Sequence, residues 1–167
     1  MPLGEAVDRT AAIARTLDLA RVAACHQAVG AMQVALDATT SYLTSRKQFG
    51  VTLNTFQALN FRASDMYVSL ELATSLTAWA TMVLVDGDDA AVADAAARAG
   101  LQVSRAGRHI GQEAIQLHGG IGMTAEYSVG HYTSRLTAID HTLGDGRQQI
   151  RNLSRRLTSY DVVEPLP

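Results

Sequence analysis

The stretch Gln116-Leu117-His118-Gly119-Gly120-Ile121-Gly122-Met123 ends a long helical pattern and places three glycines within four residues. Glycine allows the positive φ angles that terminate a helix, and it allows a backbone to approach another group closely. Three glycines at this density favour both uses together. We therefore expect a helix to end here against a ligand or a neighbouring subunit.

Three long helical patterns lead up to this glycine loop, near residues 8–46, 53–86 and 89–117. In each of them, apolar or small residues recur at steps of three and four positions, which is the period of one helix face. The chain has three prolines, and all of them lie near its ends: Pro2, Pro165 and Pro167. Proline therefore interrupts none of the three patterns.

The ends of these helices carry residues that favour termination or capping. Gly50 follows Arg46 and Lys47 and is a candidate C′ residue for the first helix. Asp88 or Asp89 can cap the third helix by accepting a hydrogen bond from a backbone amide of its first turn. Short turns are therefore expected between the helices.

Two shorter helices are expected after the glycine loop, near 129–138 and 147–159, with a bend at 144–146 between them. No stretch alternates between polar and apolar residues as a strand does. Long helices joined by short turns pack along one another, so we predict an all-α fold, an antiparallel up-down four-helix-type bundle with long helices. The expected divisions are a lead-in, the bundle domain and a tail, at residues 1–7, 8–160 and 161–167.

The composition is that of a globular domain. Apolar residues make up 47% of the 167 residues and charged residues 18%, which disfavours disorder. The net charge of −2, without a long basic block, gives no electrostatic footprint for nucleic acid. No run of about 18 uncharged apolar residues is evident and the first residues lack a secretory pattern, so no membrane contact is expected. The single cysteine, Cys25, favours a reducing, cytoplasmic location.

The sequence does not support metal or nucleophilic chemistry. The five histidines show no ligand spacing, and we interpret each as a surface or hydrogen-bonded core residue: His26, His109, His118, His131 and His141. A di-iron bundle needs paired Glu-x-x-His motifs, and none occurs. There is no Gly-x-Ser-x-Gly motif, and Cys25 in the middle of a helix has no evident base partner.

A set of polar groups and glycines remains at the helix ends, where an anionic pyrophosphate can meet a cation and exposed backbone amides. The set comprises Arg46 and Gln48 after the first helix, Gln57 in the second, Gln116, Gly119 and Gly120 after the third, and Asp145 and Gly146 at the last bend. Each of these residues alone is more often structural. Their value as a site depends on their occurring together.

Two segments occur in the order of one family's motifs. Ser45-Arg46-Lys47-Gln48-Phe49-Gly50, followed by Phe56-Gln57-Ala58, resembles an Arg-x-x-Phe-Gly…Gln segment. Gln116 to Gly122, followed by Glu126-Tyr127, resembles a Gln-x-x-Gly-Gly-x-Gly loop. Both belong to the C-terminal helical domain of the acyl-CoA dehydrogenase family, which the chain resembles over about residues 10–160. A complete member is about twice as long, so the chain is expected to be an excised domain or a naturally short protein.

The resemblance implies an FAD-dependent oxidoreductase acting on CH-CH donors, which desaturates an acyl-CoA thioester in fatty acid β-oxidation. In the family, FAD lies between this bundle and a preceding β-domain and also reaches a neighbouring subunit. The residues that would meet FAD are Arg46, Gln48, Phe49, Gln57, Gln116, Gly119 and Gly120. The apolar surfaces of the helices are too broad to be buried by contacts within one bundle alone. A homo- or hetero-oligomer is therefore expected, either a dimer or a tetramer. An electron-transfer acceptor protein is a further expected partner.

The family's catalytic glutamate lies before the last helix, where this chain reads Leu143-Gly144-Asp145-Gly146-Arg147. Counting back from Gln149 places Asp145 at the position of the base, whereas counting forward from Arg135 places Gly144 there. An aspartate is one methylene shorter, and a displacement of about 1 Å can cost on the order of a hundredfold in rate. Asp145 is therefore a candidate base, and capping of the last helix explains it equally well. Arg21 and Gly146 are the residues expected near the substrate.

The segment from Gly130-His131-Tyr132 to Arg135 resembles a branch whose members often form one subunit of a heteromeric dehydrogenase. Such a subunit can hold flavin without abstracting a proton. The alternatives to a dehydrogenase domain are therefore a non-catalytic partner subunit, a stand-alone helical oligomerisation module without flavin, and a flavin-dependent monooxygenase of the same architecture. This chain alone is expected to be inactive, because half of the flavin site would be missing.

Overall fold

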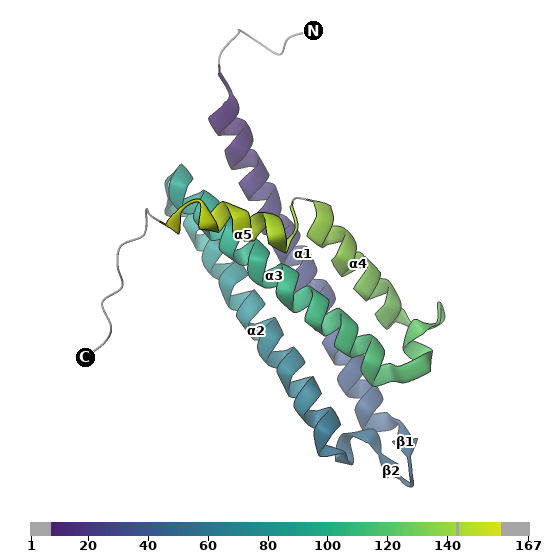
Figure 1. Ribbon diagram of the computed structural model, residues 1–167. Helices are drawn as coiled ribbons and strands as arrows, with labels where there is room; N and C mark the ends of the chain where they lie inside the picture. Colours follow the sequence, from purple (N-terminus) through teal and green to yellow (C-terminus); the bar gives the residue numbers. More distant parts are fainter. Residues whose placement is uncertain (1–7, 143, 158–167) are drawn as a thin grey trace, which may run out of the picture.

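The structure, a computed structural model, describes residues 8–142 and 144–157 of the chain. Its helices are α1 (Thr10–Ser45), α2 (Gln57–Asp86), α3 (Asp89–His118), α4 (Ser128–Thr142) and α5 (Gly146–Ser154). Two 3₁₀ turns, η1 (Leu53–Thr55) and η2 (Gly119–Met123), and the two short strands β1 (Lys47–Gln48) and β2 (Val51–Thr52) complete the fold. The predicted all-α antiparallel bundle is confirmed: α1, α2 and α3 run up and down beside one another, and α4 lies along α1 and α3 (Figure 1).

Helix α3 is the centre of the bundle, because it contacts α1, α2, α4 and α5. Small residues on α3 make this possible. A Cβ atom added at Gly111 would lie 3.0 Å from Thr133 Cγ2 of α4, and one added at Gly100 would lie 3.3 Å from side-chain atoms of both Arg21 and Gln149. Larger residues at these positions would force the neighbouring helices outward, so the close packing depends on glycine.

The core consists of alternating small and large side chains. Met32 of α1, Met66 and Leu70 of α2, and Ile110 of α3 are fully buried, surrounded by alanines. Caps fix the start of α3, where the Asp88 carboxylate accepts a hydrogen bond of 2.8 Å from the Ala91 amide. This confirms the prediction that one of the two aspartates caps that helix.

The connection between α1 and α2 differs from the prediction. Gly50 is not the C′ residue of α1, because the helix ends at Ser45 and a β-hairpin follows, with Lys47 opposite Thr52. The two turn residues, Phe49 and Gly50, have φ angles of 55° and 83°. A two-residue hairpin of type I′ requires positive φ at both positions, and an aromatic residue rarely adopts it.

Three other boundaries differ from those expected. The start of the predicted second helix is the 3₁₀ turn η1, and α2 begins only at Gln57. Helix α4 continues to Thr142, beyond the expected end at 138, whereas α5 ends at Ser154, before the expected end at 159. The lead-in at 1–7, the tail at 161–167 and the end of the predicted bundle domain lie outside the described residues.

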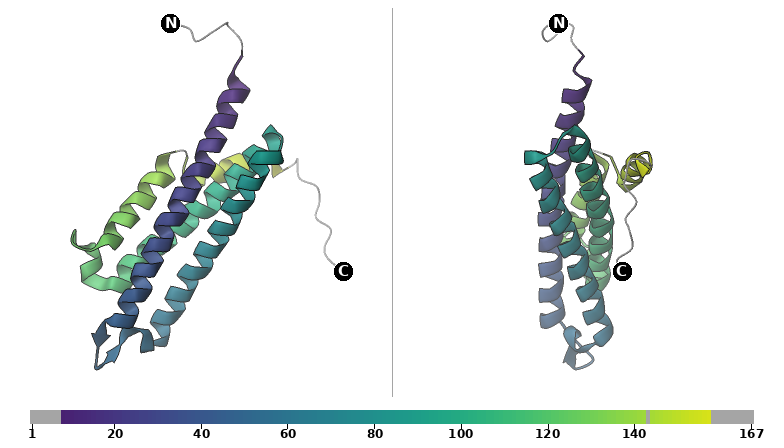
Figure 2. Two further views of the ribbon diagram at one scale, coloured as in Figure 1. Left: turned by 180° about the vertical axis from the view of Figure 1, so that it is seen from behind. Right: turned by 90° about the vertical axis from the view of Figure 1, so that its left-hand side faces the viewer.

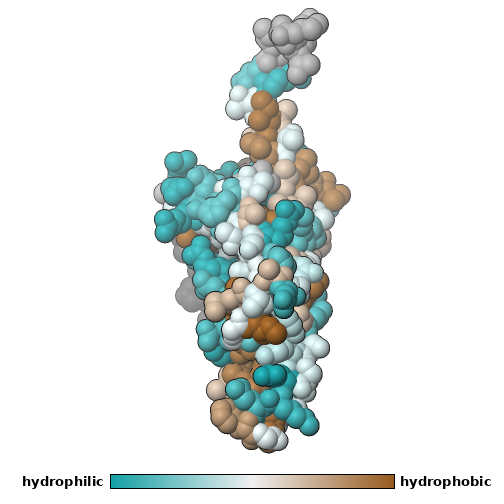
Figure 3. Space-filling view, turned by 90° about the vertical axis from the view of Figure 1, so that its right-hand side faces the viewer, coloured by the Kyte–Doolittle hydropathy of each residue, from teal (hydrophilic) through white to brown (hydrophobic). Residues whose placement is uncertain are grey.

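Apolar side chains are exposed along α1 and α2. Those of α2 are Phe61, Tyr67, Val68, Leu72, Trp79, Met82 and Val85. This helix is also the one described helix that is long and apolar enough to cross a membrane by length and composition, with a mean hydropathy of 1.5 over an 18-residue window. The sequence interpretation did not anticipate this. Further apolar patches lie where α1 begins and at the hairpin end of the molecule (Figure 3). The ribbon views of Figure 2 show that these two places lie at opposite ends of the molecule.

Replacement of Ile110 by alanine tests the central role of α3. The side chain is fully buried, so we expect Ile110→Ala to lower the free energy of unfolding by about 2–5 kcal/mol through lost burial and a residual cavity. Ile13→Ala, at a side chain 60% exposed, is the matched control and should change it by less than about 0.5 kcal/mol. Urea denaturation measures both. Equal, small effects of the two substitutions would contradict this packing.

Candidate functional site at the two ends of α3

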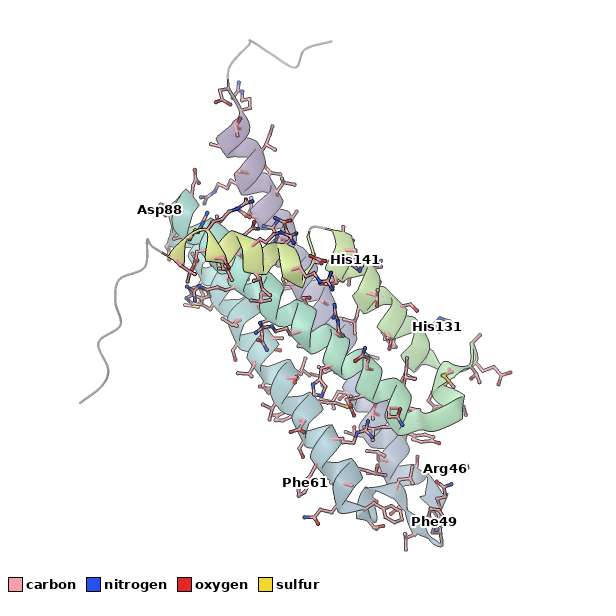
Figure 4. The ribbon with its side chains drawn as sticks, viewed as in Figure 1. Arg46, Phe49, Phe61, Asp88, His131 and His141 are labelled. Atoms are coloured by element: carbon pink, nitrogen blue, oxygen red, sulfur yellow. The ribbon has the colours of Figure 1, made fainter. Side chains whose placement is uncertain are left out.

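The residues singled out from the sequence gather at the two ends of the bundle. The cofactor residues lie around the hairpin and η2, at the end where Arg46 and Phe49 are labelled in Figure 4. Asp145, Gly146 and Arg21 lie toward the other end of the bundle, where α5 begins. We call these the glycine-loop end and the α5 end.

The two parts of the glycine-loop end are joined by an aromatic stack. The ring of His118, the last residue of α3, stacks on Tyr42 of α1 with centroids 4.5 Å apart, and Tyr127 approaches the same imidazole at 5.0 Å. Tyr42 lies one turn before Arg46, and His118 directly precedes Gly119. The stack therefore brings the end of α1 next to the glycine loop.

His118 is held by its own helix. Its Nδ1 forms a hydrogen bond of 2.7 Å with the Ala114 carbonyl oxygen, which fixes the neutral tautomer with the proton on Nδ1. Nε2 is buried and has no hydrogen-bond partner among the described residues. Burial lowers the pKa of His118, because a charged imidazolium at this position would lose its solvation.

The three glycines of the loop have different structural roles. Gly119 has a φ angle of 64°, and it ends α3 in a conformation that residues with a side chain rarely adopt. A Cβ atom added at Gly119 or Gly120 meets nothing within 4 Å, so their backbone is open to a ligand. A Cβ atom added at Gly122 would lie 2.9 Å from the Ile115 carbonyl oxygen, so this glycine serves the packing of the loop on α3.

All seven predicted cofactor residues are exposed at this end: Arg46, Gln48, Phe49, Gln57, Gln116, Gly119 and Gly120. The guanidinium of Arg46 has no acidic partner among the described residues. Phe49 is 86% exposed and contacts Phe56 edge to face. A cation, three amide side chains, an aromatic ring and open glycine backbone fit a ligand that has a pyrophosphate and flat rings, as FAD does.

At the α5 end, Asp145 is the N-cap of α5. Its Oδ1 accepts a hydrogen bond of 2.9 Å from the Gln148 amide. This hydrogen bond lowers the pKa of Asp145, and the positive charges of Arg151, His141 and Arg147 add to the effect. The carboxylate is therefore ionised at neutral pH. The capping interpretation of Asp145 is observed, and its role as a base stays a prediction.

A cleft of about 150 Å³ opens between α1, α3 and α4 next to this turn. We call it the apolar cleft, because its walls include Ala24, Cys25, Ala28, Val103, Leu136 and Ile139. Arg21 and Gly144 also line it, and Asp18 forms a salt bridge of 2.5 Å with Arg21. Burial raises the pKa of the Cys25 thiol to about 11, so this thiol is not a nucleophile at neutral pH.

Gln149 supports the turn that carries Asp145, and sequence reasoning gave it no role. The side chain is fully buried, and its Nε2 donates a hydrogen bond of 3.0 Å to the Gly144 carbonyl oxygen. Gly146 is confined by α3, since an added Cβ atom would lie 2.5 Å from Ser104 Oγ. The sequence signal for such a supporting residue is a glutamine in the first turn of a short helix that follows a Gly-Asp-Gly bend.

No group of three or more His, Cys, Asp or Glu side chains that can hold a metal ion occurs within residues 8–142 and 144–157. Three of the described histidines form hydrogen bonds with neighbouring residues. His26 contacts Thr81 Oγ1, His109 contacts Ser69 Oγ, and His131 contacts the Ala125 carbonyl oxygen.

Residues 10–158 match the family described as "Acyl-CoA dehydrogenase, C-terminal domain". The chain belongs to the acyl-CoA dehydrogenase family. The human mitochondrial short-chain specific acyl-CoA dehydrogenase is 37% identical over 127 residues, which are 75% of this chain and 30% of that protein. The two motifs recognised in the sequence therefore identified the family correctly.

Solved structures of acyl-CoA dehydrogenases have the same fold. A variant of the Tcur3481-Tcur3483 steroid ACAD superposes with a TM-score of 0.85 at 31% identity, covering 90% of this chain and 41% of that chain. Butyryl-CoA dehydrogenase from Megasphaera elsdenii gives a TM-score of 0.83 at 28% identity, covering 90% of this chain and 39% of that chain. The matched parts of this acyl-CoA dehydrogenase domain thus cover between 30% and 41% of the length of these proteins.

The neutral His118 predicts a pH dependence of stability. The pKa of His118 is lower in the folded state than in the unfolded state. Its contribution to the free energy of unfolding is therefore complete above the ordinary pKa of about 6.5, and it is lost as pH falls from there toward the folded-state pKa. His118→Phe keeps an aromatic ring and cannot titrate. We expect the wild type to lose more stability than this variant between pH 7.5 and pH 5, as measured by urea denaturation. Parallel losses in both proteins would contradict a neutral buried imidazole.

Proposed function

We propose that the chain is the part of an FAD-dependent acyl-CoA dehydrogenase that supplies one edge of the flavin site, the catalytic turn and an oligomer interface. The observation that carries this proposal is the family match over residues 10–158, on a fold that gathers the motif residues at two ends of one bundle. The whole enzyme would desaturate an acyl-CoA between its α and β carbons.

The glycine-loop end is proposed to hold FAD bound mainly by a neighbouring chain. Arg46 would pair with the pyrophosphate, the exposed amides of the loop would bind phosphate or ribose oxygens, and Gln48, Gln57 and Gln116 would donate further hydrogen bonds. Phe49 stands exposed at the tip of the hairpin and would pack on a flat ring system. Bound FAD supplies the acceptor for the hydride that leaves the β carbon.

The α5 end is proposed to hold the acyl thioester. Asp145 would take the α proton onto its carboxylate, and the apolar cleft would hold the acyl chain next to it. Arg21, which lines the cleft, would lie near the thioester. Gly146 would let the substrate come close to the backbone of the turn. A cytoplasmic location and an electron-transfer acceptor protein remain predictions that accompany this function.

A non-catalytic partner subunit is the second candidate. Asp145 is engaged as a helix cap, and Gly144 next to it has no side chain that can act as a base. One related structure carries the joint name Tcur3481-Tcur3483. In such a subunit the cleft and the turn would be retained while the partner supplies the base.

The substitution Asp145→Asn in the complete, flavin-loaded enzyme distinguishes the two. Asparagine also caps helices, so stability and flavin absorbance should persist, whereas dehydrogenation should fall at least about a hundredfold because an amide cannot accept the proton. Asp88→Asn, at the cap of α3, is the matched control and should leave turnover unchanged. Unchanged turnover of the Asp145 variant would remove this residue as the base.

The 167-residue chain on its own should form oligomers and hold little FAD. The exposed apolar residues of α2 are the expected contact between chains, and the residues proposed here would supply only one edge of the flavin site. Size-exclusion chromatography with light scattering and an absorbance spectrum after incubation with FAD measure both properties. A monomeric preparation would refute the interface, and a yellow preparation with one FAD per chain would refute the shared site.

A further inference from the structure

A second hollow lies between α3 and the start of α5, and it is strongly basic. This groove has a volume of about 380 Å³, and Arg105 and Arg108 of α3 and Arg147 of α5 line it together with His109. No aspartate or glutamate is among its lining residues. We call it the cationic groove.

The three guanidinium groups of the cationic groove are available for a ligand. Within the described part of the chain, none of them forms a salt bridge, in contrast to Arg15, Arg62 and Arg98. Their side chains are exposed, and two helices bring them to one groove. Guanidinium groups with the same charge repel one another, and an anion in the groove reduces that repulsion, beside the Asp145 carboxylate on which the charge of Arg147 already acts.

The cationic groove adjoins the apolar cleft. The two hollows share Ser104, Arg108 and Gln112 of α3, so Arg108 borders both the cationic groove and the apolar cleft. Two carboxylates lie nearby: Asp140 lines the cleft, and Asp145 caps α5 through its Oδ1. A negatively charged group is therefore favoured on the side of the groove away from the cleft.

We propose that the cationic groove binds the carboxylate of an amphiphilic ligand whose hydrocarbon chain lies in the apolar cleft. Arginine binds carboxylates through two parallel hydrogen bonds, and the cleft offers alanine, valine, leucine and isoleucine side chains to a chain of methylene groups. This site requires neither flavin nor turnover, although its cleft is the one that the proposed dehydrogenase would use for the acyl chain.

Titration of the ¹⁵N-labelled 167-residue chain with decanoate tests the site. The comparison ligands are 1-decanol, which has the same chain without the charge, and inorganic phosphate, which has charge without the chain. We expect decanoate to bind at least about tenfold more tightly than either one, as one or two charge-assisted hydrogen bonds added to apolar burial predict. Amide shifts should centre on Ser104, Gly107 and Gly146.

Two variants assign the binding to the groove. Arg108→Gln and Arg147→Gln remove exposed side chains and should each reduce the preference for decanoate over decanol by about tenfold. Arg135→Gln, an exposed residue of α4 outside both hollows, is the matched control and should retain the preference. The proposal is overturned if decanoate and decanol bind equally to the wild type. It is also overturned if both groove variants keep the preference, or if the shifts map to the exposed face of α2.

Discussion

The structure depends on the close approach that α3 allows to its neighbours. Gly100, Ser104, Gly107 and Gly111 form a stripe of small residues on α3 that faces α1, α4 and the start of α5. Added Cβ atoms would meet Leu136 at 3.5 Å or Thr133 at 3.0 Å. Because α3 carries the glycine loop at its end and Ser104 packs against Gly146 in the Asp145 turn, this one packing stripe sets the positions of both ends of the candidate site.

The long helices were predictable because their pattern is local. Apolar and small residues recur with a helical period over each of them, and Asp88 marks the start of α3 by its own side chain. The hairpin after α1 was not predictable in the same way. Its turn places Phe49 at positive φ, which no local preference of phenylalanine indicates. Gly50 signalled a positive φ correctly, but the same signal fits a helix C-terminus and a hairpin turn.

The sequence predicts the residues of the candidate site one by one, but it does not predict how the fold arranges them. The motifs that contain Arg46 and Gly119 are far apart in sequence, and each motif by itself indicates only the end of one helix. The stack of His118 on Tyr42 joins them, and such a contact has no signature in the period of either helix. The same holds at the α5 end, where the buried Gln149 fixes the turn through the Gly144 carbonyl oxygen. Tertiary contacts between elements, rather than local propensity, complete both ends.

The capping role of Asp145 and its proposed role as a base are compatible. The cap engages Oδ1 alone, and Oδ2 has no hydrogen-bond partner among the described residues. The hydrogen bond and nearby positive charges keep the carboxylate ionised, which a base requires, and they also weaken it as a proton acceptor. A shorter, more weakly basic carboxylate can abstract only a proton that is already acidified by its surroundings. The chain therefore holds a carboxylate in place, and in the proposed reaction the acidification of the substrate would come from the groups that bind the thioester.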